Sequence, residues 1–261
     1  MDPLILWIVG FTALGGALSV LAAGGVLLLP QGTMVRWLPP LVSFAIGAML
    51  GAAFLGLLPH ALEGAGDDAA HSITLTVLLG LLLFFVLEKM VIWRHCHTHE
   101  CEAHGVDLTH VQEKAAGNLI LIGDAIHNLV DGVLIAAAFL TDIHLGVVTA
   151  VAVIAHEIPQ ELGDFAILLN SGFSKGKALF YNLLVSVTTV LGGIVAYFAL
   201  GFAQAAVPYV LAIAASSFIY VAVADLIPGL HKRPEVSATV QQVLLIALGV
   251  LVIYVMHSTL H

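Results

Sequence analysis

The sequence predicts an all-α integral membrane protein with eight transmembrane helices. The 261-residue chain is 60% hydrophobic and only 10% charged, with a mean hydropathy of +1.06. Ordinary soluble domains are about 45–50% apolar and about 25% charged. The apolar residues form runs of the length that a membrane helix needs, about 20 residues. Short uncharged loops such as residues 204–208 favour helical hairpins over alternating β-barrel strands.

Eight apolar runs define the expected spans of a single transmembrane domain, residues 1–261. The first run contains no ionisable group and follows no basic segment, so it is interpreted as a span and not as a cleaved signal peptide. Residues 178–224 carry no charge and are too long for one crossing, so we expect a break near residues 204–208. The expected spans are residues 4–29, 37–59, 72–93, 115–140, 145–170, 178–202, 207–230 and 236–257.

The basic residues predict the orientation of the chain. All eight lie in or beside alternate loops: Arg36, Lys89, Arg94, Lys114, Lys175, Lys177, Lys232 and Arg233. Because Lys and Arg accumulate in cytoplasmic loops, both termini are expected outside the cytoplasm, in a multi-pass protein of the cell membrane. With eight basic and 17 acidic residues, the chain is not expected to bind nucleic acid. Its two cysteines are too few for a disulfide framework.

The expected cytoplasmic loop, residues 94–114, is rich in histidine and cysteine. Its metal-ligating residues are His95, Cys96, His97, His99, Cys101, His104 and His110. Imidazole and thiolate are ligands for zinc and neighbouring metals, although this spacing matches no zinc finger. Two interpretations stay open: a polar loop without a metal role, and a weak metal-collecting or sensing loop.

Polar residues form one stripe along each of two consecutive spans. The first stripe consists of Asp124, His127, Asn128 and Asp131, at i, i+3, i+4 and i+7. The second consists of His156, Glu157, Gln160, Glu161 and Asp164. Each repeats at helical spacing and therefore lines one helical face. Ionisable residues at bilayer depth cost several kcal/mol each and therefore indicate a functional site. The alternative interpretation of the two stripes is a polar network that only holds the two helices together.

The spacing within the stripes suits metal chelation. His127 and Asp131 are four residues apart, as are His156 and Gln160. Together they offer two nitrogens, a carboxylate and an amide oxygen, a mixture suited to zinc and other first-row divalent ions. An adjoining, more oxygen-rich position is expected from Asn128, Glu157 and Glu161.

Further polar residues are candidates for the path of the ion through the membrane. They are Asp124 and Asp164 within the stripes, Asp225 and Glu88 near the inner span ends, and His60 at an acidic outer mouth. The alternative interpretation of Asp225 and Glu88 is that they are ordinary interfacial residues.

At these residues the chain resembles the ZIP (Zrt/Irt-like) metal transporter family. The motifs are HNLVDG at residues 127–132 and HEIPQELGDFAILL at residues 156–169. FFVLEK at residues 84–89 and LPHALE at residues 58–63 are similar to the branch with an HExPHE signature. The resemblance implies eight helices with both termini outside, His127, Asp131, His156 and position 160 as primary ligands, and Asn128 and Glu157 in a second site. It also implies a homodimer that carries metal into the cytoplasm by an elevator-like motion.

Two departures from the family pattern affect the second site. Position 160 is Gln160, where relatives in this branch have His and others have a bridging Glu, and a neutral amide oxygen is a weaker ligand. The uncharged residues 178–224 also lack the carboxylate that completes the second site in some members, so Thr188 or Thr189 is the nearest polar substitute. We therefore expect one dominant metal site and a weak second one.

The sequence thus predicts a transporter of divalent cations, with zinc the ion best matched by histidine and carboxylate ligands, and with no prosthetic group. Fe²⁺, Mn²⁺ and Cd²⁺ are the other candidate cargoes. No enzymatic activity is expected. Two alternatives stay open: an intramembrane zinc hydrolase and a metal sensor without transport. The hydrolase is disfavoured because Gln160 stands where an HExxH motif has its second His.

Overall fold

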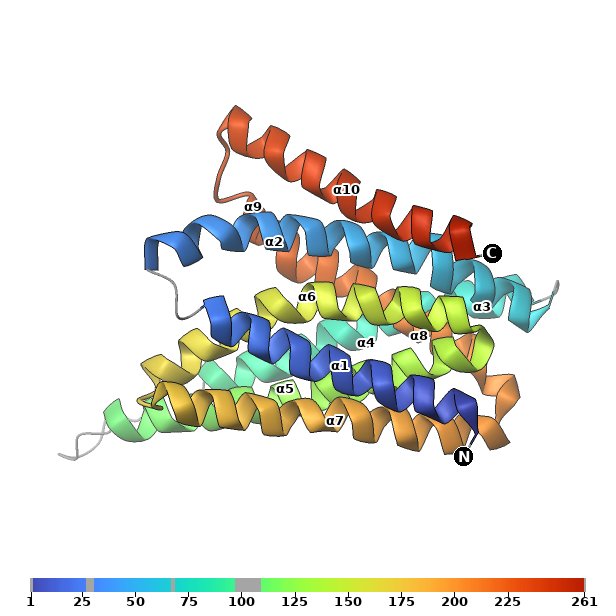
Figure 1. The fold of residues 1–261 in the computed structure, drawn as a ribbon, viewed down its shortest axis with the longest axis horizontal. Helices are drawn as coiled ribbons and strands as arrows, with labels where there is room; N and C mark the ends of the chain where they lie inside the picture. Colours follow the sequence, from blue (N-terminus) through green and yellow to red (C-terminus); the bar gives the residue numbers. More distant parts are fainter. Residues whose placement is uncertain (1, 27–30, 67–68, 97–108, 261) are drawn as a thin grey trace.

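The computed structural model describes residues 2–26, 31–66, 69–96 and 109–260, and within them the chain is almost entirely helical (Figure 1). The elements are α1 (Pro3–Val26), α2 (Gln31–Gly51), η1 (Ala52–Leu57), α3 (Leu58–Ala65), α4 (Ala70–Cys96), α5 (Thr109–Thr141), α6 (Ile143–Asn170), α7 (Lys175–Phe202), η4 (Gln204–Ala206), α8 (Val207–Tyr220), η5 (Val221–Leu226), α9 (Ile227–Leu230) and α10 (Val236–Leu260).

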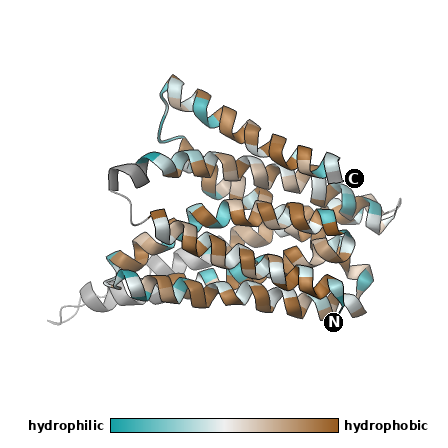
Figure 2. Cartoon of the chain, viewed as in Figure 1, coloured by the Kyte–Doolittle hydropathy of each residue, from teal (hydrophilic) through white to brown (hydrophobic). Residues whose placement is uncertain are grey.

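Eight helical segments in the described part of the chain are long and apolar enough to cross a membrane. They are Pro3–Val26, Arg36–Ala65, Ala70–Leu87, Ile120–Thr141, Ile143–Asn170, Lys175–Phe202, Gln204–Leu230 and Val236–Thr259. The predicted all-α class is confirmed, and the protein is a multi-pass integral membrane protein. Figure 2 shows hydrophobic residues along the whole length of these helices.

Several helices extend beyond the ranges expected from the sequence. The second membrane segment continues through Pro59 to Ala65. Helix α4 runs to Cys96 and α5 begins at Thr109, so the connection between them is shorter than the expected loop of residues 94–114. Residues 97–108 lie outside the described part of the chain. A run of apolar residues marks the lipid-facing part of a helix, but polar residues at its ends continue the helix into the interface.

Two short π-helical segments interrupt the second and seventh membrane segments. Segment η1 ends two residues before Pro59, and η5 ends two residues before Pro228. Proline lacks an N–H group and its ring clashes with the carbonyl four residues earlier, so the turn before it is widened. The helices therefore cross the membrane despite these prolines.

Small residues allow the helices around the polar stripes to pack closely. Helix α5 packs extensively on α7 and also contacts α6, while α1 packs on α6 and α7. A Cβ atom on Gly132 would lie 1.9 Å from the carbonyl oxygen of Thr189, and one on Gly192 would lie 2.1 Å from that of Leu129. Association by small residues is typical of helices in membranes. On the other side, α2 packs on α10 and α4 packs on α8.

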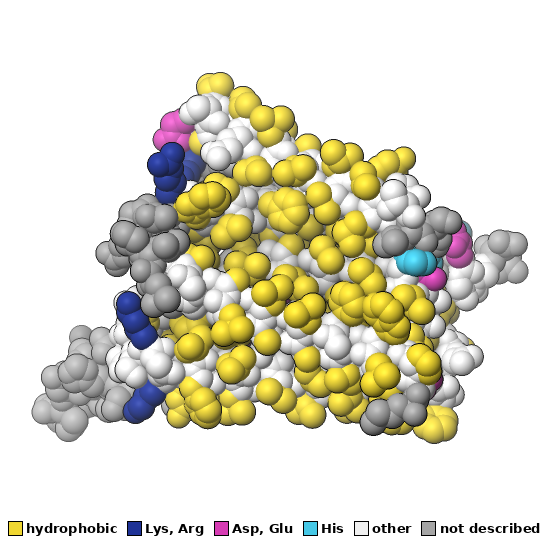
Figure 3. All heavy atoms as spheres, viewed as in Figure 1, with side chains coloured by type: hydrophobic (Ala, Val, Ile, Leu, Met, Phe, Trp, Pro, Cys, Tyr) yellow, Lys and Arg dark blue, Asp and Glu magenta, His cyan; other side chains and the backbone are white. Residues whose placement is uncertain are grey.

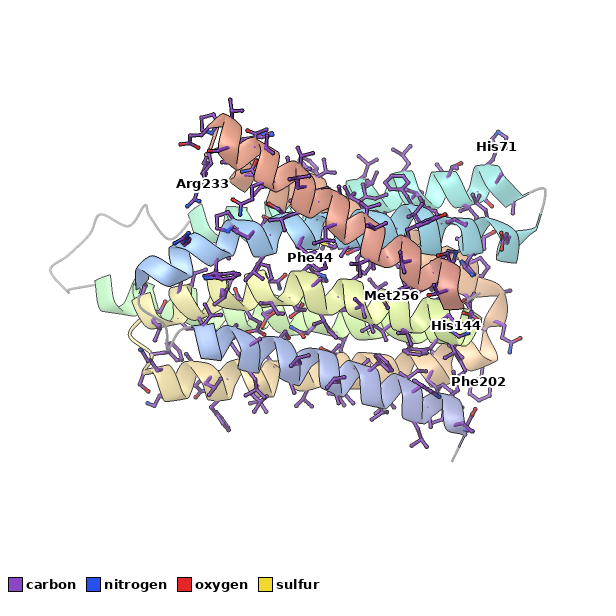
Figure 4. The ribbon with its side chains drawn as sticks, turned by 45° about the horizontal axis from the view of Figure 1, so that its top comes forward. Phe44, His71, His144, Phe202, Arg233 and Met256 are labelled. Carbon is purple, nitrogen blue, oxygen red and sulfur yellow. The ribbon has the colours of Figure 1, made fainter. Side chains whose placement is uncertain are left out.

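The surface has an apolar middle and ends of different charge. Figure 3 shows hydrophobic side chains over the middle of the molecule, and the Lys and Arg side chains in that view gather at one end. Figure 4 places Arg233 at this end, and His71 and His144 at the opposite end. The charge asymmetry predicted from the loops is therefore also present in space.

Candidate metal site

Helices α5 and α6 bring the two polar stripes together. Asp142 lies between them and caps α6, because its Oδ1 accepts hydrogen bonds from the backbone amides of His144 and Leu145 at 2.8 and 3.0 Å. The tight connection makes the helices antiparallel neighbours. The stripes therefore meet near the middle of both helices.

Four side chains converge on one point, which we call the histidine position: His127, Asp131, His156 and Glu157. His156 Nε2 lies 3.1 Å from Asp131 Oδ2 and 3.3 Å from His127 Nε2. His127 Nε2 lies 3.6 Å from Asp131 Oδ2 and 3.5 Å from Glu157 Oε1. A tetrahedral ion with bonds of about 2.0–2.2 Å places its ligands about 3.3–3.6 Å apart. The arrangement therefore fits one small divalent cation.

The backbone orients one of the two imidazole rings. His156 Nδ1 lies 3.1 Å from the carbonyl oxygen of Ala152 in the preceding turn, so Nδ1 is the nitrogen that carries hydrogen. This leaves Nε2 of the neutral ring free to bind a cation, as is usual for metal-ligating histidines. His156 is 2% exposed, whereas the side chain of His127 is 25% exposed and forms the accessible edge of the position.

Three carboxylates form a second group, the carboxylate position: Asp124, Glu157 and Glu161. Glu157 belongs to both positions. The side-chain amides of Asn128 and Gln160 donate hydrogen bonds to Asp124 Oδ1 at 2.9 and 3.3 Å. The structure therefore groups the residues differently from the sequence-based expectation: Glu157 joins the histidines, and the Gln160 amide orients Asp124.

Helix α7 contributes hydroxyl groups to this network. Thr189 Oγ1 donates a hydrogen bond of 2.6 Å to Asn128 Oδ1. Thr188 Oγ1 donates instead to the backbone carbonyl oxygens of Ala125 and Val185 at 2.9 and 2.7 Å. Of the two threonines considered from the sequence, Thr189 is therefore the one whose side chain reaches the polar network.

The buried carboxylates carry more acceptor atoms than the protein satisfies. Among the described residues, both side-chain oxygens of Glu157 and Glu161 and one each of Asp124, Asp131 and Asp164 have no hydrogen-bond partner. The ion-pair partners of Asp131 and Glu157 are His127 and His156. Uncompensated buried carboxylates are strongly destabilising, and bound cations would compensate them.

The remaining candidates belong to neither group of ligands or lie outside the described part of the chain. His60 Nδ1 lies 2.8 Å from the carbonyl oxygen of Gly56, and its ring packs edge-on against His257. Asp164 is buried, and Asp225 is exposed in η5. The Glu88, His95 and Cys96 side chains are outside the described part of the chain. So are the loop candidates His97, His99, Cys101 and His104.

Sequence reasoning missed Asn182 in α7. Its side chain is completely buried and interacts with the carboxylate of Glu161 in α6. The available signal was an asparagine inside a span, where an amide is costly unless it is paired.

Comparison with known proteins agrees with the geometry. The sequence model of the family described as ZIP Zinc transporter matches residues 93–257. The chain is 34% identical over 249 residues to zinc transporter ZIP13 of Pongo abelii, covering 86% of this chain and 70% of that protein. It is 32% identical over 276 residues to zinc transporter ZIP13 of Homo sapiens, covering 86% and 73%. To zinc transporter ZIP4 of Homo sapiens it is 30% identical over 249 residues, covering 73% and 38%. The chain belongs to the ZIP zinc transporter family.

Proposed function

We propose that this protein carries zinc across the membrane by alternating access, with the histidine position as the central binding site. The observation that supports the proposal most strongly is the convergence of two imidazole nitrogens and two carboxylate oxygens in the middle of α5 and α6. Neutral imidazole and carboxylate ligands suit zinc, and Fe²⁺, Mn²⁺ and Cd²⁺ are further candidate cargoes.

The direction we propose is into the cytoplasm. Lys175 begins α7, and Lys232 and Arg233 directly precede α10. Both helices begin at the same end of the bundle (Figure 1). The positive-inside rule makes this end cytoplasmic and both termini external. We also propose a homodimer in the cell membrane, on the basis of the family resemblance.

A transport site must release its ion as well as bind it. The partly exposed His127 is the ligand that water reaches first, so exchange of ligands for water begins at His127. The mostly buried Asp131, His156 and Glu157 hold the ion while the path to one side is closed. Movement of α5 and α6 relative to the surrounding helices would then open the site to the other side.

The test is uptake of radioactive zinc by vesicles containing the purified protein. We expect saturable uptake by the wild type and its loss in His156→Ala, because this change removes a buried nitrogen ligand. His231→Ala, which alters an exposed histidine after α9, is the control and should transport normally. Uptake by His156→Ala at the wild-type rate would refute the site, and zinc-dependent hydrolysis without flux would favour the enzyme alternative.

A further inference from the structure

Two histidines meet at the end of the bundle opposite the basic residues, where α3 lies beside the last turns of α10 (Figure 1). The rings of His60 in α3 and His257 in α10 pack edge to face, with centroids 5.8 Å apart and an interplanar angle of 80°. We propose that these two residues, the outer pair, bind one zinc ion together with water and pass it to the histidine position. The inference rests on the proposed transport function, although zinc binding at the outer pair can be measured without transport.

The outer pair has nearly the same ring geometry as the histidine position. There, the ring centroids of His127 and His156 lie 5.5 Å apart and the rings are inclined by 86°. Two imidazoles on one tetrahedral zinc ion, with bonds of about 2.0–2.1 Å, hold their ring centroids about 5 Å apart. The rings of the outer pair therefore have to approach by less than about 1 Å to share an ion.

The backbone orients the His60 ring in the same way as the His156 ring. His60 Nδ1 lies 2.8 Å from the carbonyl oxygen of Gly56, and His156 Nδ1 lies 3.1 Å from that of Ala152, in each case four residues earlier. A carbonyl oxygen only accepts hydrogen bonds, so Nδ1 carries the hydrogen and Nε2 of the neutral ring carries the lone pair. Metal-ligating histidines are usually supported by such a bond. His60 therefore has the tautomer that a zinc ligand needs.

Packing between α2 and α10 sets the register of the outer pair. The two helices pack extensively and run in the same direction from the basic end (Figure 1). A Cβ atom on Gly51 would lie 3.1 Å from the Cβ atom of Ile253, which precedes His257 by one turn. Since His60 lies at the end of the same membrane segment as Gly51, the two helices carry both rings to one place.

The outer pair is separate from the histidine position. Gly56, which orients His60, packs against the start of α6, because a Cβ atom on it would lie 3.1 Å from the side chain of Leu145. Leu145 precedes His156 by 11 residues. At a rise of about 1.5 Å per residue, the two sites are about 16 Å apart along α6. An ion at one site is therefore not bound by ligands of the other.

Two protein ligands suit a site that captures an ion and then releases it. Both rings of the outer pair are half-buried, so water reaches the site and would complete the coordination of the ion. The histidine position offers four protein ligands. Zinc is held most firmly where the protein supplies all four ligands, and a site with open positions exchanges more readily. An ion that moves inward from the outer pair would therefore be bound more tightly.

The test counts the zinc ions bound per chain by equilibrium dialysis of the purified protein in detergent. Every protein compared carries His156→Ala, which weakens the histidine position and makes the measurement independent of transport. We expect His60→Ala and His257→Ala each to remove one zinc ion, and the double variant to remove no more, because both residues bind the same ion. His71→Ala, at an exposed histidine of the same end, is the control and should bind as the parent does. Equal binding in all variants, or additive losses in the double variant, would overturn the inference.

A second variant keeps the test decisive if His257→Ala folds poorly. His257→Phe retains an aromatic ring for the edge-to-face contact but has no nitrogen ligand, so it should fold as the parent does and still lose the ion. Retention of the ion by His257→Phe would show that the contact only packs the helices, and would refute the site.

Uptake kinetics test the capture role in protein that is otherwise wild type. We expect His257→Phe to raise the KM for zinc uptake at least about threefold with little change in kcat, because the ion still crosses through the histidine position. An unchanged KM would refute the capture role. Absence of uptake by the wild type would instead refute the proposed function, while the dialysis result would still decide whether the outer pair binds zinc.

Discussion

The close contact between α5 and α7 makes Gly132 the most informative position for a stability test. Gly132 directly follows Asp131 of the histidine position. A Cβ atom at this position would lie 1.9 Å from the Thr189 carbonyl oxygen and 2.8 Å from the Gly193 amide nitrogen, and neither backbone atom can move away by itself. The change Gly132→Ala therefore has to separate the two helices.

The loss of stability in Gly132→Ala can be worked out from the contact with the Thr189 carbonyl oxygen. Increasing the 1.9 Å distance to an acceptable separation of about 3.2 Å moves α5 and α7 apart by about 1.3 Å. Overpacking of this kind costs about 1–3 kcal/mol, and stretching the hydrogen bond from Thr189 to Asn128 adds about 1 kcal/mol. Alanine has a better helix propensity than glycine, and this offsets about 1 kcal/mol of the lost stability. We expect a net loss of about 1–3 kcal/mol and weaker zinc binding.

The assay compares Gly132→Ala with Gly123→Ala on the same helix. A Cβ atom on Gly123 meets nothing within 4 Å, so this control should retain or slightly increase stability. Thermal unfolding in detergent gives the stability, and isothermal titration calorimetry gives the zinc affinity. If Gly132→Ala unfolds and binds zinc like Gly123→Ala, the close packing of α5 on α7 is refuted.

Three further predictions concern contacts around the site and at the helix ends. Thr189→Val should cost about 1–3 kcal/mol and slow zinc uptake, because it leaves the Asn128 amide oxygen without its 2.6 Å donor; unchanged unfolding and uptake would contradict this. Gly47→Ala should lower the thermal stability by about 1–3 kcal/mol by pushing α10 off α2, since its Cβ would lie 2.0 Å from a carbonyl oxygen of α10. Hydrogen bonds from the Tyr197 hydroxyl and a backbone amide lower the pKa of Asp2 below 3.8. Tyr197→Phe should therefore raise the pKa of Asp2 toward 3.8. A lowered carboxyl pKa stabilises the fold at pH values above 3.8, and this stabilisation is lost as the pH falls. The wild type and Tyr197→Phe should therefore converge in stability at acid pH.

The fold and the candidate ligands were largely accessible from the sequence. Apolar runs of membrane length predict eight spans, and residues three and four apart on a helix face one way, so His127 and Asp131 had to lie on one side of α5. A short connection at Asp142 then brings α6 against α5. These inferences depend only on local geometry.

The side-chain contacts within α6 were not accessible in the same way. By helical angle alone, Gln160 lies closer to the face of His156 than Glu157 does, because a step of four residues is about 40° and a step of one is about 100°. The Glu157 side chain nevertheless reaches sideways to His127. The contact of Asn182 with Glu161 depends on how α7 packs against its neighbours, which local sequence patterns do not determine.

The most direct test of the account is X-ray absorption at the zinc edge on the purified protein loaded with one zinc ion per chain. The histidine position predicts imidazole nitrogens at about 2.0–2.1 Å and carboxylate oxygens at about 2.0–2.2 Å, with no sulfur. The nitrogen contribution should fall in His156→Ala. A sulfur shell at about 2.3 Å that persists in this variant would place the zinc on Cys96 or Cys101 and contradict the central claim.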